Sequence, residues 1–175
     1  MESDENSAAF ILARQIAAAA PGATVRPSDS HGPGAVTGPR LREQLAIISG
    51  RRLSQFSIAI NGIRLAFWGE AAGTASREIY IEHSTILLAR LGQPATAHAS
   101  HSDAVVTALL SVLNQQATEI TLTGGQLAIS FATGLTLKVD PDQHYESWQI
   151  SSDDGLLIVC TPGGDLTIWY PPDNA

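Results

Sequence analysis

Hydrophobic and polar residues alternate with a period of two over several segments of the chain, which is the pattern of half-buried β-strands. The segments 53–60 and 63–67 are joined by Asn-Gly at 61–62, a dipeptide typical of two-residue hairpin turns. Alternation resumes at 78–82 after a loop, and the apolar residues 86–88 follow. The first half of the chain therefore predicts a three-stranded antiparallel unit and one further strand.

The second half of the chain repeats this order of segments. Three strands are predicted between residues 120 and 139, separated by turns that contain glycine. The sequence I-R-L-A-F at 63–67 aligns with L-A-I-S-F at 127–131, and in both a phenylalanine ends the strand. We interpret this as an internal duplication of a three-stranded unit over about 50–88 and 117–170, although any antiparallel meander produces a similar pattern.

Helical periodicity predicts three helices, at 7–20, 41–48 and 103–115. Ser102 or the residue after it caps the third helix, whose apolar residues fall on one face. The segment 26–40 is rich in proline, glycine and serine, as expected for a linker.

The predicted fold class is α+β. We expect an antiparallel β-sheet built from two similar three-stranded units and a C-terminal hairpin of 156–160 with 166–170, plus an N-terminal helix and a helix between the halves. Residues 1–40 are expected to form the N-terminal helix and linker, and residues 41–175 a single domain. The polar segment 93–102 is predicted to be a loop.

Composition narrows the class of protein. Of the 175 residues, 44% are hydrophobic and 15% are charged, proportions typical of a folded domain. The net charge of −7 argues against nucleic acid as a partner, because phosphate binding requires clustered lysine and arginine. A single cysteine, Cys160, excludes an intramolecular disulfide and a zinc site built from cysteines.

The N-terminal segment does not have the pattern of a signal peptide, because it begins with acidic residues and Arg14 interrupts its apolar run. The sequence contains no uncharged apolar run of about 18 residues, so no membrane span is predicted. We therefore expect a cytoplasmic protein that does not bind membranes.

Common catalytic motifs are absent from the sequence. It contains neither of the glycine-rich nucleotide-binding motifs, G-x-x-x-x-G-K-[ST] and G-x-G-x-x-G, and no G-x-S-x-G nucleophile elbow. His98, His101 and Asp103 could direct two nitrogens and an oxygen at one ion, but the sequence fixes no further ligand. We therefore predict no metal site, no cofactor and no enzymatic activity.

The segment D-P-D-Q-H-Y-E-S-W at 140–148 has the residue types of an active site. Asp142, His144 and Glu146 could act as acid and base, which gives an alternative hypothesis of a small-molecule-binding protein or hydrolase. A turn also explains the segment, because proline fixes φ and aspartate binds local backbone amides. In that interpretation the tyrosine and the tryptophan of the segment pack on the sheet.

Acidic residues concentrate in the C-terminal turns, where a basic partner protein could contact them and aromatic side chains could fill its pockets. The candidate partner-binding residues are Trp68, Tyr80, Asp140, Asp142, Glu146, Trp148, Asp153 and Asp154. Asp165 lies in the last turn of the same region. Trp68 ends a predicted strand and opens a long loop, so its position is consistent both with an anchor in a partner and with a core residue.

The C-terminal sequence, Y-E-S-W-Q-I at 145–150 followed by D-G-L-L-I-V-C-T-P-G-G-D-L-T-I-W at 154–169, resembles a small bacterial domain family of unknown function. Members of that family end in a YEAW…VC-PGG-L-W pattern, and here Ser147 replaces the alanine. The segment L-x-I-x-F-x-x-G-x-x-L-x-V-x-P-D at 127–142 is also similar to the family. The resemblance covers about residues 48–170 and assigns no catalytic residue.

Members of that family resemble compact α+β proteins encoded beside bacterial polymorphic toxins, some of which are immunity proteins. The resemblance implies a non-enzymatic protein-binding module, most specifically an immunity protein, or antitoxin. Such a protein would bind a cognate toxin domain with a basic cleft and block its active site. A further alternative is a subunit that oligomerises through exposed edge strands.

Overall fold

The computed structural model of the chain describes residues 38–68, 76–82, 85–90, 93–100 and 102–170. All of these belong to one unit that spans residues 29–171. The helix predicted at 7–20 and most of the predicted linker lie outside the described residues.

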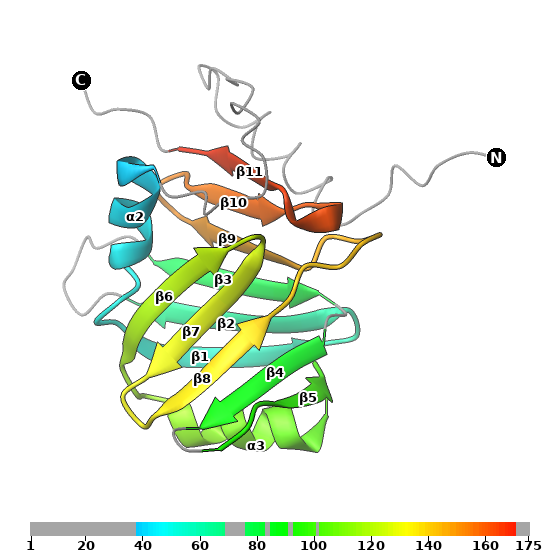
Figure 1. Cartoon of the computed structure of the whole chain (residues 1–175). Helices are drawn as coiled ribbons and strands as arrows, with labels where there is room; N and C mark the ends of the chain where they lie inside the picture. Colours follow the sequence, from blue (N-terminus) through cyan, green and yellow to red (C-terminus); the bar gives the residue numbers. More distant parts are fainter. Residues whose placement is uncertain (1–37, 69–75, 83–84, 91–92, 101, 171–175) are drawn as a thin grey trace. The chain divides into compact units, whose positions relative to one another are not determined.

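The described part of the chain forms short helices and antiparallel strands, shown in Figure 1. In chain order they are α2 (Pro39–Ala46), β1 (Arg52–Ala59), β2 (Gly62–Trp68), β3 (Arg77–Glu82), β4 (Thr85–Arg90), β5 (Thr96–Ala99), α3 (Asp103–Val112), β6 (Ala117–Thr123), β7 (Gln126–Phe131), β8 (Leu135–Val139), β9 (Trp148–Ser152), β10 (Leu157–Cys160), η1 (Pro162–Gly164) and β11 (Leu166–Trp169). Ser102 caps α3 as predicted, its hydroxyl oxygen accepting a hydrogen bond from the backbone N–H of Val105 at 3.4 Å.

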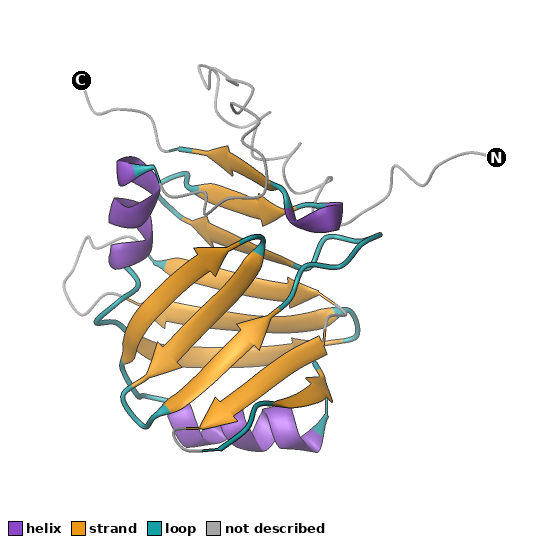
Figure 2. Ribbon diagram, viewed as in Figure 1, coloured by secondary structure: helices purple, strands orange, loops and turns teal. Residues whose placement is uncertain are grey.

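Two antiparallel sheets make up this part of the molecule (Figure 2). Sheet A has the strand order β1-β2-β3-β9-β10-β11, and sheet B has the order β5-β4-β8-β7-β6. The α+β class predicted from the sequence is therefore confirmed, with the strands divided between two sheets and not joined in one.

The two halves of the chain have the same strand order and exchange strands with each other. Each half is a helix followed by a three-stranded meander, β1-β2-β3 after α2 and β6-β7-β8 after α3. The strand that follows each meander pairs with the meander of the other half: β4 pairs with β8, and β9 pairs with β3. The next strand then returns as a hairpin, β5 on β4 and β10 on β9.

Strand registers match between the halves. Both meanders have a register shift near the start of their first strand, and the pairs Leu53–Phe67 and Ala59–Gly62 in one half correspond to Ala117–Phe131 and Thr123–Gln126 in the other. Arg52 pairs with Gln116, which is its own counterpart in the other half. The pseudo-two-fold axis of the repeat therefore passes near this pair.

Backbone hydrogen bonds around the Arg52–Gln116 bridge obey the same symmetry. They form two related pairs: Leu53 N–H to Gln115 O (3.0 Å) with Ala117 N–H to Arg51 O (2.8 Å), and Asn114 N–H to Leu53 O (2.8 Å) with Gly50 N–H to Ala117 O (2.7 Å). The duplication inferred from sequence thus has a structural counterpart, whose repeats span 39–99 and 103–160 and include the helices.

A single cluster of buried apolar side chains takes residues from both sheets and both helices. Its members in the central strands alternate with more exposed residues, and include Ile63, Leu65 and Phe67 of β2, Leu127, Ile129 and Phe131 of β7, and Leu135, Leu137 and Val139 of β8. Each fully buried side chain of this size stabilises the fold by about 1.5–3 kcal/mol. The period-two pattern of the sequence therefore predicts the buried residues of these strands correctly, but not those of β1, where Ile58 and Ile60 are exposed.

The first hairpin differs by one residue from the prediction. Ala59 pairs with Gly62, so the two-residue loop is Ile60-Asn61 and the glycine belongs to β2. A Cβ atom on Gly62 would overlap the backbone carbonyl of Ile81 in β3. Glycine is therefore required at this position by the close approach of the neighbouring strand.

The loop predicted at 93–102 is wrong in part, because Thr96–Ala99 forms β5 at the edge of sheet B. Its sequence T-A-H-A has neither the bulk nor the alternation of a half-buried strand, and most of it is exposed. Backbone pairing with β4 imposes the extended conformation here, an effect of tertiary context that local sequence does not report.

Candidate binding surface

The loop 140–147 joins β8 to β9 and is held by its own polar groups. One carboxylate oxygen of Asp142 accepts hydrogen bonds from the backbone N–H groups of His144 at 2.7 Å and Tyr145 at 3.1 Å. The hydroxyl oxygen of Ser147 accepts from the backbone N–H of Asp142 at 2.6 Å. The hydrogen bond from the His144 amide, with that from Tyr145, lowers the pKa of Asp142 below its ordinary value.

Two neighbouring turns lock this loop in place. The N–H of Gly163 donates to the carbonyl oxygen of Asp142 at 2.8 Å, which ties η1 to the loop. A Cβ on Gly125, in the β6–β7 turn, would lie 2.5 Å from the Cα of Gly164, and a Cβ on Gly164 would lie 3.2 Å from Pro141. We call this group of turns, residues 124–125, 140–147 and 162–164, the platform.

The floor of the platform is buried. Trp148 is 1% exposed, and its indole N–H donates to the carbonyl oxygen of Gly125 at 2.9 Å. The thiol of Cys160 lies 3.4 Å from the same oxygen. Burial, together with the carboxylates of Asp165 and Glu146, raises the pKa of the Cys160 thiol to about 12, so this cysteine is a core residue.

The outer surface of the platform presents an aromatic ring among carboxylates. Tyr145 is 72% exposed, so the prediction that it packs on the sheet is wrong, while the predicted Asp142 turn and the packing of Trp148 are confirmed. The acidic residues of this region are Glu82, Asp140, Asp142, Glu146 and Asp165. Burial and the nearby Glu146 carboxylate raise the pKa of Glu82.

A strip of polar and aromatic side chains on β2 and β3 of sheet A adjoins the platform. Trp68 is 54% exposed and lines a shallow groove of about 120 Å³ with Gln55, Phe56, Ser57, Arg64, Ala66 and Glu78. Further along β3, burial and the Glu82 carboxylate raise the pKa of Tyr80. The backbone N–H of Glu82 donates to the carbonyl oxygen of Ser147 in the platform at 3.0 Å. The strip Trp68, Glu78, Tyr80 and Glu82 therefore leads from the groove to the platform.

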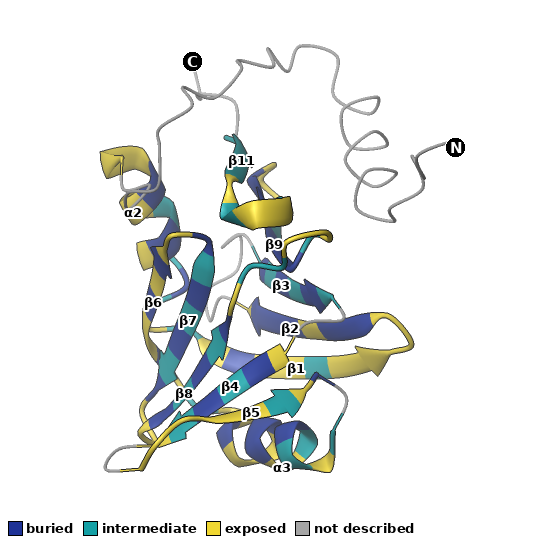
Figure 3. Cartoon of the chain, turned by 45° about the vertical axis from the view of Figure 1, so that its right-hand side comes forward, coloured by how far each residue is buried: buried dark blue, intermediate teal, exposed yellow. Residues whose placement is uncertain are grey.

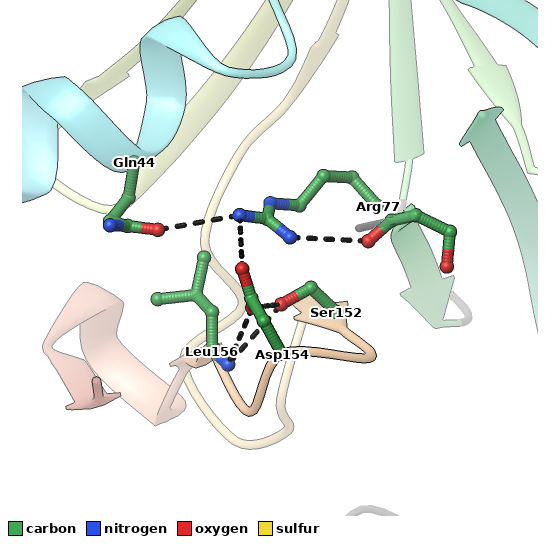
Figure 4. Close-up of polar contacts among 6 residues, drawn as sticks. Gln44, Arg77, Ser152, Asp154 and Leu156 are labelled. Carbon is green, nitrogen blue, oxygen red and sulfur yellow. Dashed lines mark hydrogen bonds and ion pairs between the residues drawn. The ribbon is translucent and has the colours of Figure 1, made fainter. Parts of the chain in front are cut away.

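The acidic turns do not form one patch. Asp142 and Glu146 precede β9, whereas Asp153 and Asp154 follow it, and a five-residue strand separates its two ends by roughly 13 Å. Asp154 also has a structural role, because its carboxylate binds the buried guanidinium of Arg77 at 2.9 Å (Figure 4). Only the first group of carboxylates belongs to the platform.

Two of the three guanidinium nitrogens of Arg77 have polar partners in the fold interior, whereas its buried Nε has none among the described residues. Its guanidinium also donates to the side-chain oxygen of Gln44 on α2 at 3.4 Å and to the carbonyl oxygen of Ser76 at 3.2 Å. Burial alone would raise the pKa of Asp154, but hydrogen bonds from Ser152 and Arg77 and the charge of Arg77 outweigh it and lower that pKa. This contact joins α2, β3 and the β9–β10 turn.

The residues proposed for catalysis line neither of the two hollows described for this structure. Asp142 uses its carboxylate to hold the backbone of the loop, and the side chain of His144 is exposed. A hollow of about 340 Å³ lies elsewhere and is lined by Leu88, Arg90, Gln93, Pro94, Thr96, Asp103, Ala104, Thr107, Ala108 and Leu135. Among the described residues, no group of three or more His, Cys, Asp or Glu side chains could hold a metal ion. His101 lies outside that part of the chain.

Comparison with known proteins places this chain in a family. The profile of a family of unknown function, DUF6188, matches residues 43–170. The chain belongs to DUF6188. The matched region contains both meanders and the whole platform, in agreement with the resemblance noted in the C-terminal sequence.

The DUF6188 profile names a family without an assigned activity, and it does not link the chain to immunity proteins. Searches of curated proteins and of solved structures gave no match. None of the helices in the described part of the DUF6188 chain is long and apolar enough to cross a membrane.

Sequence reasoning missed one feature of the platform and one of the strip. The sequence predicts that Tyr145 packs on the sheet, but this residue lies in a run of polar residues, Q-H-Y-E, that is typical of an exposed loop. Glu82 is absent from the predicted partner-binding residues because it ends a strand whose pairing with β9 the sequence does not reveal. Trp148, in contrast, is a core residue, so it is left out of the surface proposed below.

Proposed function

We propose that this DUF6188 domain is a protein-binding module whose binding surface is the platform with the adjoining strip of sheet A, and whose partner is a basic protein. The contact residues are Trp68, Tyr80, Glu82, Asp140, Asp142, Tyr145 and Glu146. The observation that carries this proposal is Tyr145, which is 72% exposed on a loop whose backbone the Asp142 carboxylate holds.

The physical argument rests on preorganisation and charge. An aromatic side chain on a fixed loop loses little conformational entropy when it enters a pocket, and tyrosine and tryptophan are common binding hot spots. The carboxylates around Tyr145 attract a cationic surface and orient it during association. Tyr80 and Trp68 extend the aromatic contact along the strip, where Trp68 is 54% exposed.

The more specific proposal is a cytoplasmic immunity protein. In this form the partner is a toxin domain with a basic active-site cleft, which the platform covers and thereby blocks. The acidic balance of the chain supports this form. Inhibition of this kind requires only occlusion, so the platform does not need catalytic groups.

Co-expression with the product of the adjacent gene tests both the protein-binding function and the immunity role. We expect the two proteins to co-purify, and we expect the chain to restore growth of cells that produce the adjacent protein. Co-purification without rescue of growth would support a binding module and contradict the immunity role. If the two proteins do not co-purify and growth is not restored, the partner assignment as a whole is contradicted.

Substitutions in the platform test the binding surface. Tyr145→Ala should weaken binding at least tenfold, the scale of a hot-spot residue. Asp142→Ala should weaken it similarly, because the loop loses the acceptor for two backbone amides. Asp142→Asn separates the two roles of this residue, since the asparagine carbonyl accepts the same hydrogen bonds without the charge, and it should weaken binding less than Asp142→Ala. Equal binding by all three variants and the wild type would show that the partner binds elsewhere.

A further inference from the structure

The edge of sheet A at β1 is only partly covered. The first residues of β1 are bonded to the segment before β6, through Arg52 with Gln116 and through the backbone of Leu53. Beyond the register shift that follows Leu53, β1 is mainly exposed (Figure 3), and no further strand pairs with it in sheet A of the described structure. Within the described residues, most of this strand is therefore an edge without a strand partner.

The internal repeat allows the β1 edge to be compared with the equivalent strand, β6. Helix α2, which belongs to the same half as β1, contacts β6 of the other half, and the apolar residues Ile120 and Leu122 of β6 are 7% and 4% exposed. Their counterparts in β1 are Phe56, which is half-buried, and Ile58, which is 44% exposed. The next residue but one, Ile60, is 92% exposed. The β1 edge thus leaves apolar side chains uncovered that its counterpart buries.

The unpaired backbone groups of β1 determine what kind of structure can bind at this edge. An edge strand carries unpaired N–H and C=O groups, and proteins commonly protect such edges with lysine or proline. The segment 53–63 contains no charged residue and no proline. It therefore presents both the hydrogen-bonding groups and the apolar side chains that another strand requires.

We propose that a second copy of this chain covers the edge, with the two β1 strands antiparallel and a two-fold axis close to Ser57. Two chains of net charge −7 repel each other, so a self-contact is most favourable where the surface is uncharged, as at 53–63. In this register Ser57 faces Ser57 of the other copy, and Ile58 of each copy faces Phe56 of the other. The pairing extends sheet A across both copies and covers the apolar side chains that are exposed in one.

The contact is small. One pair of strands of this length with a few aliphatic side chains buries less area than the roughly 1,200 Å² of a standard stable interface. We therefore expect a dissociation constant on the order of micromolar, so that monomer and dimer exchange within an accessible range of concentration. This inference does not depend on the proposed toxin partner.

Sedimentation velocity over a hundredfold range of concentration tests the proposal with a matched pair of variants of the full chain. Ser57→Lys places like charges across the two-fold axis and should weaken dimerisation at least tenfold. Thr121→Lys introduces the same charge at the equivalent exposed position of β6, and it should leave dimerisation unchanged. A wild-type monomer at all concentrations, or equal effects of the two substitutions, would overturn the proposal.

A cysteine pair tests the register. Residues that face each other in an antiparallel pair have Cα atoms about 4.5–5.5 Å apart, a distance that a disulfide spans. Ser57→Cys should give a disulfide-linked dimer under mild oxidation, whereas Thr121→Cys should not, and the native Cys160 is buried. Crosslinking through position 121 and not through position 57 would place the contact on β6 and refute the β1 pairing.

Discussion

Arg77 and Asp154 form an ion pair of unequal burial: the arginine side chain is 1% exposed, while the aspartate side chain, 2.9 Å away, is 36% exposed. Desolvation therefore falls more heavily on the cation, although burial also desolvates part of the carboxylate. When such a pair is broken, the cost depends on which charge is left behind, because a buried charge without its partner cannot regain its hydration. This asymmetry can be measured.

The first prediction compares the two ways of breaking the pair. Asp154→Asn leaves the guanidinium buried without its counter-ion and should lower the free energy of unfolding by about 3 kcal/mol. Arg77→Met leaves a carboxylate that water can reach and replaces the arginine by a side chain of similar length, so its cost should be clearly smaller. Urea unfolding at pH 7 measures both. An equal cost for the two substitutions would show that burial of the cation does not determine the stability of this contact.

The second prediction concerns the stability of the Arg77–Asp154 contact at low pH. The pKa of Asp154 is lowered in the folded state, so the stability that its ionisation provides is present above the unfolded pKa, about 3.9 for aspartate, and is lost as the pH falls through the lower folded value. The difference in unfolding free energy between the wild type and Asp154→Asn should therefore shrink between pH 5 and pH 2. Urea titrations across this range provide the measurement. A difference that stays constant would contradict the ionic origin of the stabilisation.

The third prediction uses two adjacent glycines of the platform. Gly124 and Gly125 both have positive φ, 54° and 79°, but a Cβ on Gly124 would meet no atom within 4 Å, whereas one on Gly125 would meet the backbone of Gly164. Gly124→Ala should cost about 1–2 kcal/mol for the left-handed conformation. Gly125→Ala should cost more and should also weaken partner binding, because η1 must move away. Thermal unfolding compares them, and equal costs would show that the contact with Gly164 is unimportant.

The fourth prediction concerns Cys160, which is buried and whose pKa is raised to about 12. Because the thiolate is the reactive form, the native protein should react with a thiol reagent at pH 8 far more slowly than the protein unfolded in urea. The ratio of the two rates, measured by absorbance, is the test. Rapid labelling of the native chain would show that the floor of the platform opens readily.

Local patterns in the sequence predict the hairpins well, because each depends on neighbours in the chain. The alternation of Ile63, Leu65 and Phe67 predicts one buried face, and all three are 0% exposed. The exchange of β4 and β9 between the halves depends on pairs distant in sequence, such as Ile81 with Trp148. Neither residue carries a local signal of that pairing, so strand order could not be predicted.

The candidate surface was predicted in part for the same reason. The acidic turns were expected to act together, but β9 separates Asp142 from Asp154, and Arg77 binds the latter from a position 77 residues earlier in the chain. The turn formed by Asp142 was predictable, because aspartate before a short polar run binds local amides wherever the chain turns. The exposure of Tyr145 depends on how the other two turns hold the loop.

The last prediction addresses Glu82, whose pKa is raised first by burial and then by the Glu146 carboxylate. A raised pKa means that the folded state disfavours the ionised form, so Glu82 opposes folding at neutral pH and this effect disappears as the pH falls below the unfolded value, about 4.3. Glu82→Gln should therefore stabilise the fold at pH 7, by about 0.5 kcal/mol, the usual scale for a substitution outside the core, and should have no such effect at pH 3.

If the carboxylates serve a basic partner, the same substitution should weaken binding at low ionic strength, because a charge that opposes folding would be retained for recognition. Glu119→Gln is the control, since this exposed carboxylate lies on β6, outside the platform and the strip. Unfolding free energy and partner affinity, measured on both variants, separate the effect of Glu82 on stability from its effect on partner binding. A Glu82→Gln variant that is more stable and binds equally well would show that Glu82 is not part of the binding surface.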